Sequence, residues 1–284
     1  MRKLRTLAQQ RFIADYLLSG RYEVSGGAIV YEQTESIYSD RPPAPVAPGS
    51  AYSETTTGTG PAQMANTAKW GEDTLITDEA IKRRRMDPVQ RAMIKVVNQM
   101  VKTVDGNALS VIASQVTQTS VATGGAGSGN WANSSTATIF RDCMVAKAKV
   151  RKLNQGYELD TLAVDDVTWA NIISDPAIAL LLRRESPASP IYTGDLPEIG
   201  QLRVLPTPNI PTPGTAILVD HSLLGGMADE EIGGPGYVRA QDGIPGLEAK
   251  IMREDKEDQW RLRCRRSTVP IVIEPNAAWV ITGV

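Results

Sequence analysis

The stretch that decides the fold reads RPPAPVAPGSAYSETTTGTGPAQMANTAKWG (residues 41–71). It is rich in Pro, Gly and Thr and lacks helical periodicity, and structureless stretches this long usually serve a function. Two runs rich in Thr, Ala and Tyr, 51–57 and 62–70, flank the turn signal Gly58-Thr59-Gly60-Pro61. They predict a long two-stranded hairpin. Because a lone hairpin is marginal in water, we expect it to lie on its own body or on a neighbouring subunit.

A long amphipathic helix is predicted after this stretch. Thr77-Asp78-Glu79 indicates a helix start, and Asp87-Pro88 indicates a restart with proline at the first helical position. One apolar stripe then runs for about five turns, and the run 108–113 extends or follows it. The stripe consists of Val89, Met93, Val96, Val97, Met100, Val101 and Val104.

The remaining two thirds of the chain mix helices with strands. A helix is predicted over about 136–153, and strand 159–164 leads into a helix that is capped by Asp165 or Asp166 and broken at Pro176. Four further strands are predicted at 201–209, 215–220, 247–254 and 259–266, and TVPIVIEP and AAWVITG follow them. The pattern predicts an α+β fold.

The first 19 residues predict a basic helix that Gly20 ends. Arg2, Lys3, Arg5 and Arg11 stand there against one acid, Asp15. The segment is either a solvated terminal helix or an arm that lies on acidic protein or nucleic acid.

Composition excludes several classes of protein. The 284 residues are 42% hydrophobic and 22% charged, as in ordinary soluble globular proteins. No apolar run is long enough to cross a membrane, and Gln9 and Gln10 interrupt any signal-peptide core, so a cytoplasmic site of synthesis and assembly is expected. A net charge of −2 argues against strong binding of polyanions by the chain as a whole.

Little in the sequence predicts catalysis. No phosphate-binding loop or nucleophile elbow occurs, and neither a cofactor nor a metal site is expected. Cys143 and Cys264 are interpreted as buried small hydrophobes. Asp220-His221 is the one pair whose residue types suggest a catalytic site. However, the side chains of adjacent residues at a strand end point to opposite sides, which favours a surface histidine. Asp229-Glu230-Glu231 is interpreted as a solvated acidic loop.

QWRLRCRR (259–266) predicts a strand with one buried and one basic face. Trp260, Leu262 and Cys264 would be buried, and Arg261, Arg263 and Arg265 would form the other face. That face is either solvated and balanced by the acids of 254–258, or turned toward another subunit or DNA.

Several phrases resemble those of phage major capsid proteins of the Hong Kong 97-type fold, especially from phages of actinobacteria. The resemblance runs in order along nearly the whole chain and rests on many short phrases. These are APGSAY (47–52), AKWGEDTLITDEAIKR (68–83), VNQMVKTVDGNALSVI (97–112), LNQGYELDTLAVDDVTWANIISDPAI (153–178), LPTPNIPTPGTAILVD (205–220) and LGGMADE (224–230).

The resemblance implies an architecture for the chain. Residues 1–24 would be an N-terminal arm, and 25–75 an extended loop that overlaps a neighbouring subunit. Residues 76–158 would form a peripheral domain with a long spine helix, and 159–246 an axial domain. Residues 247–284 would return to the peripheral domain and supply a closing strand.

The resemblance also implies a function and partners. Hexamers and pentamers of the chain would tile an icosahedral shell around double-stranded DNA in the virion, touching the DNA non-specifically. A separate scaffolding protein, a portal protein and a decoration protein would be its other partners, without a membrane. The family's prototype forms Lys–Asn isopeptide crosslinks from a lysine in its extended loop, and Lys69 is the lysine that falls in that region here.

Two other functions are open at this point. Encapsulin nanocompartments share the fold but enclose a cargo enzyme, so shell diameter and DNA content would separate them from phage. A small α/β enzyme with a site at Asp220 and His221 would be a monomer or dimer with a pocket, but it leaves the hairpin and the basic arm unexplained.

Overall fold

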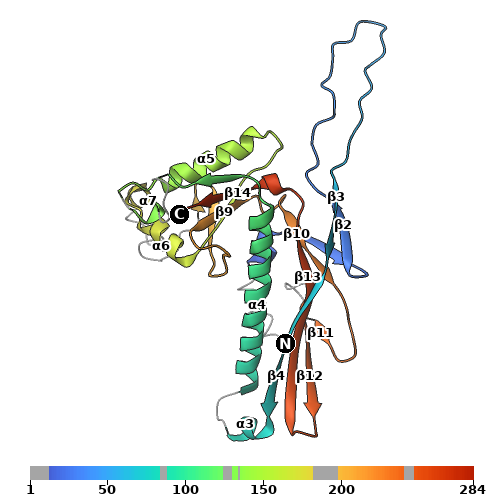
Figure 1. The fold of residues 1–284 in the computed structure, drawn as a ribbon, viewed down its shortest axis with the longest axis vertical. Helices are drawn as coiled ribbons and strands as arrows, with labels where there is room; N and C mark the ends of the chain where they lie inside the picture. The colour runs from blue at the N-terminus through green and yellow to red at the C-terminus, as the bar shows by residue number, and fades with distance from the viewer. Residues whose placement is uncertain (1–12, 84–87, 124–129, 134, 182–197, 240–245) are drawn as a thin grey trace.

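The computed structural model describes residues 13–83, 88–123, 130–133, 135–181, 198–239 and 246–284. One long helix runs beside a long sheet, a second sheet with its own helices lies at one end of that helix, and a loop projects beyond both (Figure 1). The mixture of helices and two mainly antiparallel sheets agrees with the predicted α+β class.

Helix α4 (Pro88–Gln115) is the centre of the fold. It is one uninterrupted helix of 28 residues, so the run 108–113 extends the predicted stripe. At 1.5 Å per residue it is about 42 Å long. Its stripe belongs to a core that includes Cys264 and Ala249 of the first sheet and Ile217 of the second, so α4 packs against both sheets.

The first sheet is long and narrow. Its strand order is β1 (Gly20–Val24), β10 (Gly225–Glu230), β13 (Gln259–Val272), β12 (Glu248–Glu254) and β11 (Val238–Arg239). Strand β4 (Ala68–Thr77) pairs with the other side of β13, from Thr77 opposite Gln259 to Ala68 opposite Thr268. The short helix α3 (Asp78–Arg83) follows β4, and Thr77 accepts a hydrogen bond from the Ala80 N–H as its predicted cap.

The second sheet holds the strands β5 (Thr119–Val121), β14 (Ala278–Thr282), β9 (Thr215–Val219), β6 (Thr161–Val164), β8 (Leu202–Pro206) and β7 (Glu198–Ile199) in that order. One face packs on α5 (Ile139–Lys152), α6 (Asp166–Ser174) and α7 (Pro176–Leu181). Asp165 caps α6 through the Thr168 N–H, and the helix breaks at Pro176 as predicted. Two single 3-10 turns, η1 (Asn130–Ala132) and η2 (Pro275–Ala277), complete the described elements.

The predicted hairpin of 51–57 with 62–70 is wrong in its pairing. Strand β3 (Ala62–Asn66) pairs with β2 (Ala28–Glu32), and residues 33–61 form the loop between them. β2 takes the place beside β3 that 51–57 was predicted to occupy, which leaves 51–57 without a strand partner in the described chain. Residue 67 separates β3 from β4, which continues into the first sheet.

Gly20 begins a strand and does not end a helix. Of the predicted N-terminal helix, only α2 (Ala14–Leu17) lies in the described residues. Gly20 pairs with Gly226, and a Cβ on Gly226 would overlap the Gly20 carbonyl, so glycine permits this close approach. β1 thus joins the first sheet through residues that we assigned to the arm, and β10 joins it through residues that we assigned to the axial domain. The division into arm and domains stays a prediction.

Candidate assembly surfaces

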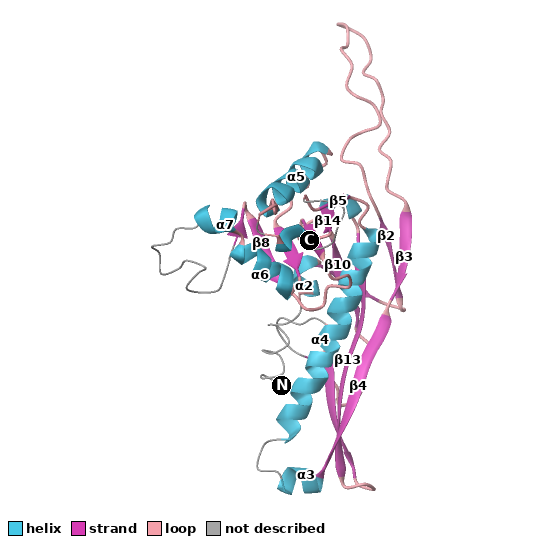
Figure 2. Cartoon of the chain, turned by 60° about the vertical axis from the view of Figure 1, so that its left-hand side comes forward, coloured by secondary structure: helices cyan, strands magenta, loops and turns pink. Residues whose placement is uncertain are grey.

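The β2–β3 hairpin and its loop project from the body. Both views show the loop reaching beyond the two sheets, at the end of the molecule opposite α3 (Figures 1 and 2). Every residue from 34 to 59 is exposed. The base is fixed to the body, because Thr34 N–H donates to the Ile273 carbonyl and Gln33 side-chain N–H donates to the Val272 carbonyl. The loop is therefore a projection with a fixed root and an uncovered length.

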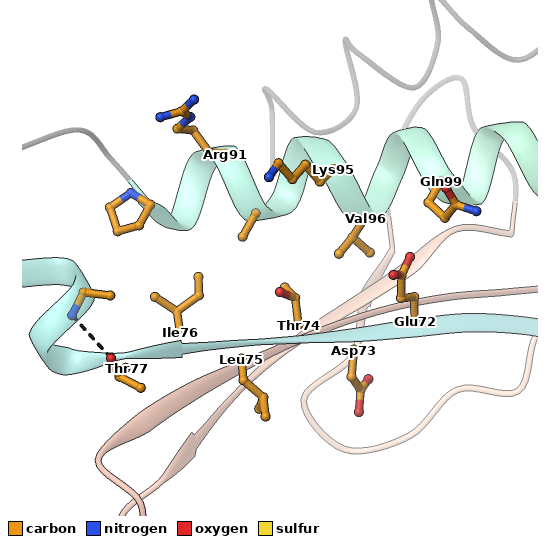
Figure 3. Close-up of a pocket in the computed structure, with 13 residues that line it drawn as sticks. Glu72, Asp73, Thr74, Leu75, Ile76, Thr77, Arg91, Lys95, Val96 and Gln99 are labelled. Carbon is orange, nitrogen blue, oxygen red and sulfur yellow. Dashed lines mark hydrogen bonds between the residues drawn. The ribbon is translucent and has the colours of Figure 1, made fainter. Parts of the chain in front are cut away.

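A groove of about 1100 Å³ lies between α4 and β4. Figure 3 shows Glu72, Thr74 and Ile76 pointing from the strand toward the helix, while Asp73 and Leu75 point away. The helix contributes Arg91, Lys95, Val96 and Gln99 to the other wall. The groove has a basic and polar helical wall and a mixed strand wall.

The predicted arginine face of β13 is paired within the chain. Arg263 binds Asp73 of β4 with two hydrogen bonds of 2.7 and 2.6 Å, and Arg261 binds both Asp73 and Glu254. The hydrogen bonds from Arg263 hold the pKa of Asp73 below its usual range. Glu254 was among the predicted acids, whereas Asp73 comes from a strand nearly 190 residues away and was not.

Two residues of that strand depart from the predicted pattern. Arg265 is buried and bonds to Glu248 of β12 at 2.6 Å, with its guanidinium over the Tyr237 ring. Trp260, which was predicted to be buried, is 36% exposed because it lies in the last rows of the sheet beside the acidic turn, beyond the apolar core. Arg253 covers its ring instead.

The segment 13–18 is anchored where α4 and both sheets meet. Ala14, Leu17 and Leu18 are fully buried in the core of α4. The carboxylate of Asp105, on α4, accepts hydrogen bonds from the Ile13 and Ala14 N–H groups at 3.2 and 3.1 Å, and so caps α2. The four predicted arm residues Arg2, Lys3, Arg5 and Arg11 lie outside the described residues.

A buried ion-pair cluster adjoins this anchor. Arg266 is fully buried and bonds to Asp15 of α2 and to Asp229 of β10 at 2.9–3.1 Å. Burial alone would raise the pKa of Asp15, but Arg266 and Arg21 hold it below its usual value. Asp229 and Glu230 belong to strand β10, so the prediction of an acidic loop is wrong at these two positions. The arginine requires a carboxylate partner there, because an unpaired buried charge is costly.

Asp220 and His221 do not act as a pair. The Asp220 carboxylate accepts from the Ser222 N–H and the Glu158 N–H and so closes a turn. His221 Nδ1 meets the Asp160 carboxylate, and its ring stacks on Tyr16 with centroids 5.2 Å apart. The histidine therefore contributes to the anchor of the N-terminal segment.

Lys69 lies on β4, on the body of the molecule. It is exposed and stands opposite Ser267 of β13, so it is at the root of the extended region and outside the projecting loop. Cys143 and Cys264 are free and buried, as predicted. Burial raises the pKa of the Cys143 thiol to about 12, which leaves it protonated and unreactive at neutral pH.

Two kinds of site are absent from the described residues. No group of three or more His, Cys, Asp and Glu residues is placed to hold a metal ion. No described helix has the length and apolar character that a membrane span requires.

The sequence model of the phage capsid protein family matches residues 60–281, more than three quarters of the chain. The chain belongs to the phage capsid protein family. No curated protein matches this capsid protein in sequence.

Solved structures share its fold. The capsid structure of cyanophage P-SCSP1u superposes with a TM-score of 0.65 at 12% identity, covering 96% of this chain and 88% of that one. A structure from Microbacterium phage Oxtober96 has a TM-score of 0.61 at 11% identity and covers 95% and 90% of the two chains. The virus-like particle of Pyrococcus furiosus has a TM-score of 0.59 at 11% identity and covers 99% and 98%.

These comparisons confirm the predicted family and the predicted Hong Kong 97-type fold of a phage major capsid protein. The capsid protein is a shell protein, and membership of this family implies self-assembly and a place in the virion. Sequence reasoning missed the Arg266 cluster and the cap at Asp105. Acidic partners far away in sequence give no local signal for such contacts.

Proposed function

We propose that this capsid protein assembles as hexamers and pentamers into an icosahedral shell that encloses double-stranded phage DNA. The observation that carries the proposal is the family match over residues 60–281. The projecting loop supports it, because 26 consecutive exposed residues, 34–59, need a surface that the described part of the chain does not supply.

Assembly would use many weak contacts at once. The body is held by two sheets packed on α4 and acts as a rigid tile, while the loop and the N-terminal arm act as straps to neighbouring tiles. Each contact can be weak, because closing a lattice makes every further contact intramolecular in effect. Maturation would then be a rigid-body rearrangement of preformed domains along the predicted boundaries, with the straps adjusting.

We propose no enzymatic role and no cofactor. Contact with DNA would be local and non-specific, since the net charge of −2 gives the chain little overall attraction for phosphate. Arg261 and Arg263 are half-buried and already paired with Asp73 and Glu254, which leaves the arm residues Arg2, Lys3, Arg5 and Arg11 as the better sites for such contact.

The scaffolding, portal and decoration proteins stay predictions, as do assembly in the host cytoplasm and the Lys69 crosslink. A denaturing gel of mature particles tests the crosslink. A single band near 30.7 kDa would exclude it, and a ladder of multiples would support it.

Electron microscopy tests the main proposal. The protein is expressed alone and again with its neighbouring phage genes, and the products are imaged and assayed for nuclease-protected DNA. Closed shells, with protected DNA when the packaging genes are present, are the expected result. A monomer or dimer in both preparations would contradict the proposal.

An encapsulin-like shell is the second candidate. It is favoured by the similarity to the virus-like particle of Pyrococcus furiosus, which covers nearly the full length of both chains. The same preparations separate the two functions. Small shells without DNA, each holding one co-purified protein, would favour the encapsulin-like function.

A further inference from the structure

A second groove, the arm-root groove, lies where the N-terminal segment meets α4. It has a volume of about 630 Å³ and runs between α4 and residues 206–209 at the end of β8. Ile13, the first described residue, also lines it. Two of its lining residues are lysines, Lys95 and Lys102, and none of the described residues that line it is acidic. The groove is therefore positively charged in a chain that has more acidic than basic residues.

The helical wall of this groove exposes positive charge alone. Lys95 and Lys102 are both exposed, and neither forms a hydrogen bond or an ion pair with another described residue. The one acid in α4 is Asp105, which is fully buried and accepts the hydrogen bonds of the Ile13 and Ala14 N–H groups. The two ammonium groups are therefore available to an outside partner.

The opposite wall is uncharged and held in place by hydrogen bonds. Residues 205–214, LPTPNIPTPG, contain no charged side chain. Thr207 is fully buried, and its N–H donates to the Val164 carbonyl at 2.8 Å. The Asn209 N–H in turn donates to the Thr207 hydroxyl oxygen at 3.2 Å. The groove is thus preformed, and a partner need not order this wall when it binds.

The basic N-terminal segment joins the described chain at this groove. Residues 1–12 carry the four basic residues of the predicted arm and no acid, and they precede Ile13 directly. A basic segment is not complementary to a groove whose charged side chains are lysines. The arm and the groove therefore favour the same kind of partner, a polyanion.

The spacing of the two lysines suits a DNA strand. Seven residues make nearly two helical turns, so Lys95 and Lys102 lie on the same face of α4, about 10.5 Å apart along its axis. This is about three nucleotide steps of one strand at 3.4 Å each. Lysine contacts phosphate well as a point charge, whereas it is depleted from interfaces between proteins. These properties favour DNA over a protein as the occupant.

We propose that the arm-root groove opens to the interior of the shell and binds the phosphate backbone of the packaged DNA through Lys95 and Lys102. The contact reads no sequence, because phosphates are the same at every base pair. This inference rests on the proposed shell function and specifies where the body of the subunit, as distinct from its arm, touches the DNA.

The salt dependence of DNA binding tests the two lysines directly. The full-length chain, kept unassembled at low concentration, is titrated with a short DNA duplex at several salt concentrations. Lys95→Gln/Lys102→Gln is expected to reduce the slope of log K against log salt by about 1.8, because each phosphate contact contributes about 0.9. An unchanged slope in this variant would overturn the inference.

Two further variants serve as controls. Lys152→Gln/Lys256→Gln removes the same charge at two exposed lysines outside the groove and should leave the slope unchanged. Lys95→Arg/Lys102→Arg keeps both charges and should keep the slope. A control slope that falls as far as that of the groove variant would assign the effect to net charge. A reduced slope in the arginine variant would assign it to the structure of the subunit, and either result would overturn the inference.

A map of wild-type particles separates this inference from the shell function. DNA density against α4 at Lys95 and Lys102, on the inner side of the shell, would support both. DNA-filled particles in which the groove faces outward, or is filled by a protein segment, would overturn the DNA contact alone. Failure of the wild type to form particles would overturn the shell function.

Discussion

Arg266 and Asp105 are buried ionisable residues, and both form hydrogen bonds with the segment that precedes β1. Arg266 is fully buried between Asp15 and Asp229. Burial alone would lower its pKa, but the two carboxylates raise it overall, so the guanidinium stays charged. The cluster connects the start of the described chain to β10 and β13.

Replacing Arg266 is expected to destabilise the subunit strongly. Arg266→Met leaves Asp229 buried without its counter-charge and leaves Asp15 with only the partly exposed Arg21, which costs about 3–5 kcal/mol of unfolding free energy. Denaturant unfolding of the unassembled subunit measures this loss. Arg263→Met is the control, because that arginine is partly exposed and its pair contributes about 1 kcal/mol or less. Equal losses in the two variants would contradict the account.

Asp105 makes stability depend on pH near neutrality. Burial raises its pKa from 3.8 to about 7, while the N–H groups of Ala14 and Ile13 partly oppose the shift. Because the folded pKa lies above the unfolded one, the folded state binds the proton more tightly. This contribution to stability is complete below pH 4 and is lost as the pH rises to 7. Asp15 titrates below this range, since its pKa is lowered.

Asp105→Asn is expected to remove this pH dependence. The amide is neutral at all pH values and still offers one oxygen to the two N–H groups. The variant should therefore gain stability relative to wild type as the pH rises from 5 to 8, by about 1–3 kcal/mol. Thermal unfolding at several pH values measures the difference. A difference that stays constant over this range would show that Asp105 does not titrate there.

The contacts of individual residues were the features least predictable from the sequence. Cys143 and Cys264 were correctly expected to be buried, because they lie on apolar stripes. The partners of Arg266 were not, since Asp15 lies 251 residues away and nothing local marks it. The same holds for Asp105, whose carboxylate caps a helix in a distant part of the chain.

At the scale of elements, helix α4 contains a glycine that lowers its stability. Gly106 lies in its interior, and a Cβ there would meet nothing within 4 Å. Glycine costs a helix interior about 1 kcal/mol relative to alanine. Gly106→Ala is therefore expected to raise the unfolding free energy by about 0.5–1 kcal/mol.

The control for that substitution is Gly226→Ala in β10. There the new Cβ would overlap the Gly20 carbonyl of β1, so the variant should be destabilised. Denaturant midpoints of the two variants give the comparison. A loss of stability in Gly106→Ala would mean that the helix needs glycine at this position.

Elements with a clear hydrophobic periodicity could be predicted from the sequence, whereas the pairing of strands could not. The stripe of α4, the cap of α6 and strands such as β9 and β14 follow from local pattern. The partner of β3 does not, because β2 precedes it by a loop of 29 residues, 33–61, and the turn signal Gly58-Thr59-Gly60-Pro61 in that loop indicated pairing with 51–57 instead. β10 was missed because the partners of its acids lie far away in sequence. Arg266 of β13 neutralises Asp229, and the Thr67 hydroxyl donates a hydrogen bond to Glu230.

At the scale of the whole molecule, body and loop should be independent. The loop from 41 to 57 has no described hydrogen bond to the body, apart from contacts within the loop itself. Deleting 41–57 is therefore expected to leave the unfolding free energy of the subunit within about 0.5 kcal/mol of wild type. Particle formation should be lost, because the strap to the neighbour is gone.

Sedimentation and denaturant unfolding of the same preparation check both halves of this prediction. A stable subunit that no longer forms particles is the expected result. Normal particles from the deletion variant would show that the loop is dispensable for assembly.

The central claim is that this chain is the repeating unit of a closed shell. A cryo-EM reconstruction of particles from cells expressing it with its neighbouring phage genes tests this most directly. The account predicts a shell in which every unit shows one long helix, α4, beside the long sheet, with the loop of 33–61 extended over an adjacent unit. Particles built from another chain, or a preparation containing only monomers and dimers of this one, would contradict it.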